Sequence, residues 1–131
     1  MNPVKHMAII MDGNGRWGLK NRNSRNLGHK EGIKTVEMAM KYCIKKQIKF
    51  LTLYAFSTEN WKRPLKERNY LFNLLEIYLR EKLERINKEK IKIKIIGEKN
   101  FSKSLNKLLD YAEKKTLKNI KLQINLALNY G

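Results

Sequence analysis

Apolar residues recur along the chain in four short runs, separated by three stretches of helical periodicity. The runs are rich in β-branched and aromatic residues, which predicts strands at Met7–Met11, Phe50–Phe56, Ile91–Ile96 and Ile120–Leu128. Between the runs, apolar residues spaced three and four apart predict three helices. The helical sets are Ile33, Val36, Met40, Cys43 and Ile44; Leu71, Leu74, Leu75, Tyr78, Leu79, Leu83 and Ile86; and Leu105, Leu108, Leu109 and Ala112.

Strands that alternate with helices favour parallel pairing with right-handed crossovers. The expected fold class is therefore α/β, with a mostly parallel β-sheet and helices on both faces. The run FLTLYAF is apolar at nearly every position, as in a central strand covered on both faces, whereas IKIKII alternates and is expected nearer an edge. Pro64 suits the first turn of the second helix, where its missing N–H costs nothing.

Length and composition indicate one globular domain over residues 1–131, since 42% of the residues are hydrophobic and 31% are charged. Cys43 is the only cysteine, which excludes an intrachain disulfide and a cysteine zinc cluster and fits a cytoplasmic protein. Because Cys43 lies on the apolar stripe of its helix, we expect a buried thiol. The apolar stretch before Asp12 is too short for a signal peptide or a membrane span.

The formal net charge of +17 raises nucleic acid and anionic membrane surfaces as candidate partners. Most lysines, however, lie on the polar faces of amphipathic segments such as RINKEKIKIK, so a solvated basic surface is the simpler interpretation and no nucleic-acid partner is expected. One window differs, because residues 13–30 hold five basic side chains and no acid. These are Arg16, Lys20, Arg22, Arg25 and Lys30.

The acid-free window begins in AIIMDGNGRWG, the segment that follows the first predicted strand. Gly13 and Gly15 let backbone N–H groups approach a phosphate, and Asn14 can donate through its amide. The guanidinium groups of Arg16 and Arg25 can form two parallel hydrogen bonds to diphosphate oxygens. This combination predicts a site for a diphosphate.

Asp12 would repel that diphosphate unless a divalent cation lay between them, and Mg²⁺ is the usual cation at a site with one carboxylate. The simpler alternative is a polar turn in which Asp12 caps a helix. The spacing G-x-G-x-x-G is also the dinucleotide-binding fingerprint, which would indicate an oxidoreductase. That alternative is weaker, because the bulky Arg16 and Trp17 separate the glycines and NRNSRN is poor helix interior, so the helix is expected only from about His29.

A second polar segment, STENWKR, follows the second predicted strand. Ligands of parallel α/β sheets bind outside the carboxyl ends of the strands, so the two segments face one cleft if their strands are neighbours. Trp61 and Arg63 can stack on and clamp a ligand, although Trp61 could equally be a packing anchor. Ser57, Thr58 and Glu59 could instead cap the helix after Pro64.

His29 stands at the start of the first helical pattern, where a helix N-terminus favours a neutral imidazole that can accept or relay a proton. From spacing alone, a polar helix-start residue is as good an interpretation. His6 precedes a strand and is given no role.

The segments HMAIIMDGNGRWG, GHKEG, LTLYAFSTENWKRP and LNYG resemble the cis-prenyltransferase (undecaprenyl diphosphate synthase) family, in register from about Lys5 to Gly131. The resemblance implies a Mg²⁺-dependent cytoplasmic enzyme that works at the inner face of the membrane. Its reaction would condense isopentenyl diphosphate with an allylic primer such as farnesyl diphosphate. The product would be a long Z-polyprenyl diphosphate, the lipid carrier for cell-wall synthesis.

The resemblance also implies roles for individual residues. Asp12 matches the acid that serves Mg²⁺ and catalysis, and Asn60 matches a residue proposed for proton removal, a step for which His29 is a further candidate. The allylic diphosphate pocket matches Gly13, Asn14, Gly15, Arg16, Arg25, His29 and Arg63. Further substrate contacts match Trp17, Ser57, Thr58, Glu59 and Trp61.

The apolar side of the second helix, from Leu71 to Ile86, is expected either to line a tunnel for the growing chain or to pack in the core. The sequence departs from the family in length, since members continue with a second half. By the resemblance, that half holds the isopentenyl diphosphate motif, a glutamate that shares the metal and much of the homodimer contact. Residues 1–131 alone are therefore expected to be inactive.

Overall fold

The computed structural model describes residues 4–10, 18–21, 23–57 and 64–130. Residues 18–21 form a single helical turn. The longer elements, in chain order, are β1 (His6–Ile10), α2 (Arg25–Lys45), β2 (Phe50–Ser57), α3 (Leu65–Lys88), β3 (Ile91–Ile96), α4 (Lys103–Lys115) and β4 (Leu122–Tyr130).

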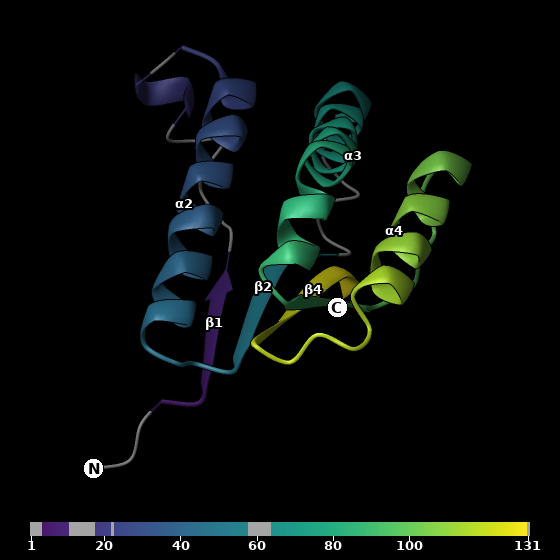
Figure 1. The fold of residues 1–131 in the computed structure, drawn as a ribbon. Helices are drawn as coiled ribbons and strands as arrows, with labels where there is room; N and C mark the ends of the chain where they lie inside the picture. The colour runs from purple at the N-terminus through teal and green to yellow at the C-terminus, as the bar shows by residue number, and fades with distance from the viewer. Residues whose placement is uncertain (1–3, 11–17, 22, 58–63, 131) are drawn as a thin grey trace.

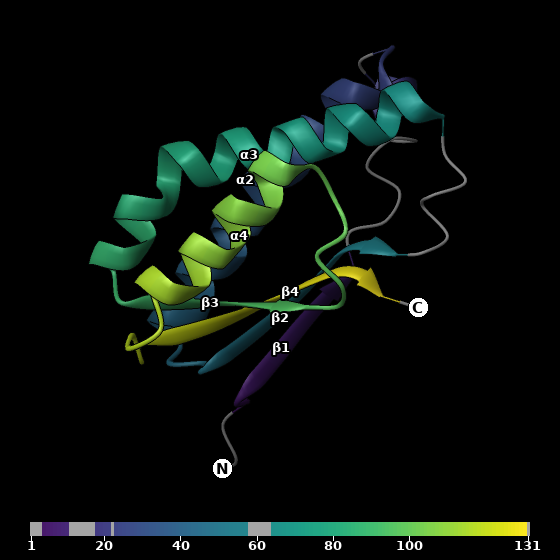
Figure 2. The ribbon, with the colours of Figure 1, turned by 90° about the vertical axis from the view of Figure 1, so that its right-hand side faces the viewer.

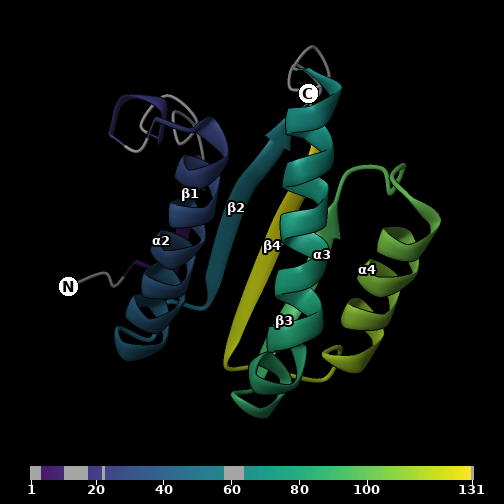
Figure 3. The same ribbon diagram turned by 90° about the horizontal axis from the view of Figure 1, so that it is seen from above.

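The four strands form one parallel sheet in the order β1-β2-β4-β3 (Figure 3). The segment FLTLYAF lies in β2, between two neighbouring strands, and IKIKII forms β3 at an edge of the described sheet, so the predicted central and edge positions are confirmed. The α/β class and the parallel sheet are confirmed as well.

The helices α2, α3 and α4 all lie over the same face of the sheet (Figures 1 and 2). Helices on the opposite face stay a prediction, since no described helix lies there. The two faces of the sheet differ in solvent exposure. In β2, Leu51 on the side of the helices is fully buried, whereas Phe50 on the opposite face is 41% exposed. The face under the helices is the helix face, and the opposite face is the open face.

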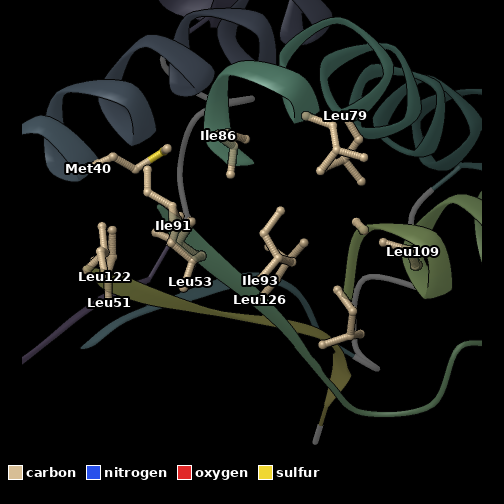
Figure 4. Close-up of a cluster of buried hydrophobic side chains, with 14 of the residues drawn as sticks. Met40, Leu51, Leu53, Leu79, Ile86, Ile91, Ile93, Leu109, Leu122 and Leu126 are labelled. Atoms are coloured by element: carbon tan, nitrogen blue, oxygen red, sulfur yellow. The ribbon is translucent and has the colours of Figure 1, made fainter. Parts of the chain in front are cut away.

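The hydrophobic core lies between the helices and the helix face (Figure 4). Leu51, Leu53 and Ile93 rise from the strands to meet Met40 of α2 and Leu79 of α3. Successive strand side chains point to opposite faces, so each strand contributes alternate residues to this layer.

Cys43 is also part of the core and is fully buried, as predicted. Burial raises the pKa of its thiol, because the thiolate would have to form away from water. The side chain therefore acts as a small hydrophobic residue.

Helix α4 covers the outer edge of β3. The backbone N–H of Ile93 donates to Thr116 Oγ1 at 2.9 Å, and the N–H of Ile95 donates to Glu113 Oε2 at 2.9 Å. Glu113 also pairs with Lys99, which bonds Asp110 at 2.6 Å, and these hydrogen bonds raise the pKa of Lys99. Two backbone N–H groups at the edge of β3 thus have hydrogen-bond acceptors within the chain instead of water.

Several element boundaries differ from the predictions; for example, β1 begins at His6 rather than Met7, and β4 ends at Tyr130 rather than Leu128. Helix α2 begins at Arg25 rather than near His29. Asn23, with φ 55°, lies between α2 and the helical turn before it, so the stretch NRNSRN interrupts the helix near Asn23 and not throughout. Strand β4 begins at Leu122 rather than Ile120, which lies in the connecting segment before it with its side chain 85% exposed. Pro64 is the N-cap of α3 and lies just before its first turn.

We expect Ile91→Ala to lower the free energy of unfolding by about 2–5 kcal/mol, because it leaves a cavity at a fully buried position. Urea denaturation followed by circular dichroism measures the change. The matched control is Ile120→Ala, which removes the same atoms from a side chain that is 85% exposed, and should change stability by less than about 0.5 kcal/mol. Equal effects of the two substitutions would contradict this assignment of the core.

Candidate functional site

The predicted site begins at the carboxyl ends of β1 and β2. These strands are parallel neighbours, and Ile10, the last residue of β1, pairs with Tyr54 of β2. The segment that starts at Asp12 and the segment that starts at Ser57 therefore both follow the carboxyl ends of neighbouring parallel strands, on the same side of the sheet, as predicted. Strand β4 ends there too, since Ser57 pairs with Tyr130 of the LNYG motif.

The N-terminal ends of α2 and α3 lie at this same end of the molecule (Figures 2 and 3). The first turn of a helix has backbone N–H groups without intrahelical partners and carries a partial positive charge, which favours bound anions. The first turn of α2 holds no acidic residue, and that of α3 holds Glu67. Backbone dipoles and the basic window thus favour the same sign of ligand charge.

Most of the predicted site residues lie outside the described residues, so their predicted roles stay predictions. They are Asp12, Gly13, Asn14, Gly15, Arg16, Trp17, Thr58, Glu59, Asn60, Trp61 and Arg63. For Arg25, His29 and Ser57 the backbone alone is described. His29 is the fifth residue of α2 rather than its first, because the helix starts earlier than its apolar pattern does.

The carboxyl end of β2 is irregular in a way that its sequence does not show. The register between β2 and β4 shifts between Tyr54 and Phe56 and again between Phe56 and Ser57. Such bulges redirect the chain, and they occur often next to active sites. Here the irregularity comes immediately before the predicted substrate-binding segment STENWKR.

Gly18, the third glycine of the glycine-rich segment, packs on the start of α2. A Cβ atom at Gly18 would lie 2.3 Å from the Ser24 carbonyl oxygen and 2.5 Å from Gly28 Cα. The Gly18 carbonyl also accepts a hydrogen bond from the Ser24 N–H at 3.1 Å. The glycine spacing could have indicated this close contact between two backbones, but the prediction concerned phosphate binding alone.

Helices α2 and α3 are joined by an ion pair between Glu37 and Arg85, at 2.7 Å, and the hydrogen bond to Glu37 raises the pKa of Arg85. Nearby, burial and the charge of Glu37 raise the pKa of Tyr78 to about 12, so its hydroxyl stays neutral at physiological pH. These groups stabilise the packing of two helices and belong to no predicted catalytic set.

The long helix α3 divides between the two roles considered for it. Leu79, Leu83 and Ile86 in its C-terminal half are buried in the core, so this part packs as core. In its N-terminal half, Leu71, Phe72 and Leu75 are only partly buried. A lining role for an isoprenoid tunnel stays a prediction for that half.

Within the part of the chain that the structure describes, no group of three His, Cys, Asp or Glu side chains is arranged to hold a metal ion. Asp12, the predicted ligand, lies outside that part. In the sequence it follows the last residue of β1 by two positions. A single carboxylate there fits Mg²⁺, which is usually held by one or two carboxylates together with substrate phosphates and waters.

No described helix is both long enough and apolar enough to cross a bilayer.

Comparison with known proteins gives consistent matches. The family model that describes undecaprenyl diphosphate synthase matches residues 10–131. The ditrans,polycis-undecaprenyl-diphosphate synthase of Pasteurella multocida, specific for (2E,6E)-farnesyl diphosphate, is 47% identical over 131 residues, which are 99% of this chain and 55% of that protein. The isoprenyl transferase of Clostridium tetani is 46% identical over 99% of this chain and 51% of its own length.

Two crystal structures share the fold. An undecaprenyl diphosphate synthase from Campylobacter jejuni matches with a TM-score of 0.80 and 36% identity over 100% of this chain and 57% of its own. The lavandulyl diphosphate synthase of Lavandula x intermedia, in complex with dimethylallyl diphosphate, matches with a TM-score of 0.91 and 29% identity over 98% of this chain and 56% of its own. The chain thus spans about half the length of these proteins.

We expect Gly18→Ala to lower the free energy of unfolding by about 1–3 kcal/mol, because the new methyl group collides with backbone atoms that cannot rotate away. This loss exceeds the gain of about 0.4–1 kcal/mol that alanine gives by restricting the unfolded chain. Thr35→Ala, at an exposed position of α2, is the control and should change stability by less than about 0.5 kcal/mol. Equal urea midpoints for the two variants would argue against the close contact.

Proposed function

Because this chain belongs to the undecaprenyl diphosphate synthase family of prenyltransferases, we propose that it is the allylic-diphosphate-binding half of a Mg²⁺-dependent cis-prenyltransferase. The whole enzyme would extend farnesyl diphosphate with isopentenyl diphosphate to a long Z-polyprenyl diphosphate. The farnesyl-specific synthase of Pasteurella multocida supports this choice of primer. Since the chain spans about half the length of its relatives, the complete reaction is proposed for the whole protein.

The observation that carries the proposal is the parallel pairing of β1 with β2. The strands that precede DGNGRWG and STENWKR, two segments far apart in the sequence, therefore end on the same side of the sheet. The N-terminal ends of α2 and α3 lie at the same end of the molecule (Figures 2 and 3), and the acid-free basic window of the sequence runs into α2. A diphosphate carries the charge that such an edge would bind.

In this proposal the protein's own groups hold and polarise the leaving diphosphate. Backbone N–H groups at Gly13 and Gly15 and the side chains of Asn14, Arg16, Arg25 and Arg63 bind its oxygens. These contacts strengthen as negative charge develops on the diphosphate when the bond from C1 breaks, so they stabilise the transition state more than the bound substrate. Trp17, Ser57, Thr58, Glu59 and Trp61 orient the two substrates.

C4 of isopentenyl diphosphate attacks C1 of the primer, diphosphate leaves, and loss of a proton from C2 sets the Z double bond. Asn60, His29 and Asp12 are the groups proposed to position or accept that proton. Mg²⁺ held by Asp12 would neutralise charge on the diphosphate.

The remaining parts of the proposal concern the whole enzyme. The isopentenyl diphosphate site, a second metal ligand and the homodimer contact are assigned to the half that this chain does not span. The lipid product implies work at the inner face of the membrane. We accordingly propose that residues 1–131 alone have little or no prenyl transfer activity.

The reaction can be tested with a chimera in which this chain replaces the matched segment of the Clostridium tetani isoprenyl transferase. Given farnesyl diphosphate, labelled isopentenyl diphosphate and Mg²⁺, the chimera should form extended lipid, measured by thin-layer product sizing. Asp12→Ala should lower kcat by about 10²-fold or more, because charge on the leaving group is no longer neutralised. Asp110→Ala removes an exposed carboxylate of α4 and should leave kcat within about twofold. A folded chimera that extends no primer would refute the proposed reaction.

Diphosphate binding can be tested on the 131-residue chain itself by calorimetry with farnesyl diphosphate and Mg²⁺. Arg25→Ala should weaken binding about tenfold or more, because it removes charge-assisted hydrogen bonds. Arg80→Ala, on the exposed side of α3, should have little effect.

The same measurements address the alternative that the net charge of +17 makes this chain a nucleic-acid binder. In that case affinity for a DNA duplex would fall steeply with salt, and each exposed lysine would contribute a little. Equal loss of farnesyl diphosphate affinity for Arg25→Ala and Arg80→Ala would favour such diffuse charge over the proposed site.

A further inference from the structure

A lysine stands immediately before each of the four strands, and all four of these lysines are exposed. They are Lys5, Lys49, Lys90 and Lys121. The Lys49 carbonyl accepts a hydrogen bond from the Gln123 N–H at 2.8 Å, and the Lys90 carbonyl accepts one from the Lys121 N–H at 3.0 Å. The Lys5 carbonyl accepts the N–H of Phe50 in the same way. The four lysines therefore form a row across the amino end of the sheet, where the strands begin.

The helices add further lysines at the same end of the molecule. The C-terminal ends of α2, α3 and α4 lie beside the starts of the strands, opposite the end at which the candidate site begins (Figures 2 and 3). Together with Lys5, residues 45–49, 88–90 and 114–121 hold ten lysines and one acid, Glu89, and are called the amino-end surface. The lysines that join the first four are Lys45, Lys46, Lys88, Lys114, Lys115 and Lys118.

None of these ten lysines forms an ion pair with a residue that the structure describes. Lys34 and Lys99, in contrast, pair with carboxylates. Lysines in the last turn of a helix offset the partial negative charge of its free carbonyl groups, which accounts for those at the ends of α2, α3 and α4. It does not account for Lys5, Lys49 and Lys121, which belong to no helix. The amino-end surface therefore has positive charge to offer to an anionic partner.

Two aliphatic side chains project from the middle of this charge. Leu117 is 59% exposed and Ile120 is 85% exposed, in the segment KKTLKNIK that joins α4 to β4. Ile120 is the most exposed large hydrophobic side chain within the described residues. The segment is held from the inside, because Thr116 is buried and the Asn119 amide donates to the Ile91 carbonyl at 2.8 Å. The fold thus fixes two apolar side chains in water among lysines.

We propose that the amino-end surface binds the surface of an anionic lipid bilayer. Leu117 and Ile120 enter the boundary between head groups and acyl chains, and the surrounding lysines lie close to the lipid phosphates. Apolar insertion and attraction to anionic lipids add to one another, so this combination holds a protein at a membrane surface. The opposite end of the molecule, where the candidate site begins, then stays in water. The inference uses no residue of that site and does not rest on the proposed function.

Nucleic acid is the less suitable partner for the same charge. Proteins that bind it use the planar guanidinium group of arginine on phosphates and bases, and aromatic side chains on which bases stack. Residues 45–49, 88–90 and 114–121 contain no arginine and no aromatic residue. Exposed leucine and isoleucine gain nothing from phosphates in water, whereas they lose their contact with water in a bilayer.

Co-sedimentation of the chain with vesicles tests the apolar contribution. The chain should bind vesicles of phosphatidylglycerol and phosphatidylcholine in equal amounts at least about tenfold more tightly than phosphatidylcholine alone. Leu117→Ala combined with Ile120→Ala should weaken this binding about tenfold or more, because less apolar surface is inserted. The control, Met38→Ala with Ile77→Ala, truncates side chains that are 69% and 53% exposed on α2 and α3, and should change binding by less than about twofold.

A second pair of variants tests whether the position of the charge matters. Lys118→Gln with Lys121→Gln should weaken vesicle binding about tenfold or more, because each lysine lies near the lipid phosphates. Lys103→Gln with Lys107→Gln lowers the net charge equally, at exposed positions in the N-terminal half of α4, and should weaken binding less than about threefold. Equal losses would show that diffuse charge drives binding and would overturn the proposal.

A fluorescent label reports the contact without weakening it. Because Cys43 is fully buried, a cysteine introduced by Ile120→Cys can be labelled selectively with an environment-sensitive dye. Its emission should shift to the blue with anionic vesicles, whereas the same dye at Ile77→Cys should not respond. The proposal is wrong if the two labels respond alike. It is also wrong if duplex DNA displaces the chain from vesicles while the Leu117 and Ile120 substitutions leave binding unchanged. Neither diphosphate nor Mg²⁺ is present, so the outcome is independent of the proposed reaction.

Discussion

The parallel alignment of β1 with β2 is the constraint on which the candidate site depends. Each peptide group that joins the two strands fixes their direction, and direction decides at which edge the following segments emerge. If the pairing were antiparallel, the glycine-rich segment and STENWKR would leave the sheet at opposite ends. Backbone hydrogen bonding between β1 and β2 thus determines where the two segments leave the sheet, and the arrangement of the site's side chains depends on it.

The helix face supplies the stability that holds this alignment. Aliphatic side chains from every strand pack in one core with side chains of α2, α3 and α4, and the Glu37–Arg85 pair links α2 and α3 at the protein surface. Helix α4 also covers the outer edge of β3, because Glu113 and the C-cap residue Thr116 accept hydrogen bonds from backbone N–H groups there. Other parts of the chain therefore cover one edge of the sheet, at β3, and one face, the helix face.

Local pattern was sufficient to predict the fold class, the edge position of IKIKII, the central position of FLTLYAF and the burial of Cys43, since periodicity reports directly on burial. It could not predict that α4 covers the edge of β3, because the bonds to Ile93 and Ile95 join residues far apart in sequence. The same holds for the contact of Gly18 with α2, which depends on two backbones meeting. For the site, parallel pairing predicted a common side for the two segments if their strands were neighbours, which only the structure shows, and the roles of Asp12 and Asn60 stay predictions.

The strand order has a consequence for synthesis of the protein on the ribosome. Strand β4 is the last of the four to be made, yet it lies between β2 and β3. Until β4 emerges, β3 has no strand beside it, and the inner edge of β2 stays open to whatever else can pair with it. The nascent chain therefore carries unpaired apolar strands until Leu122–Tyr130 has emerged, and a molecular chaperone that shields β2 during that interval would protect it from aggregation.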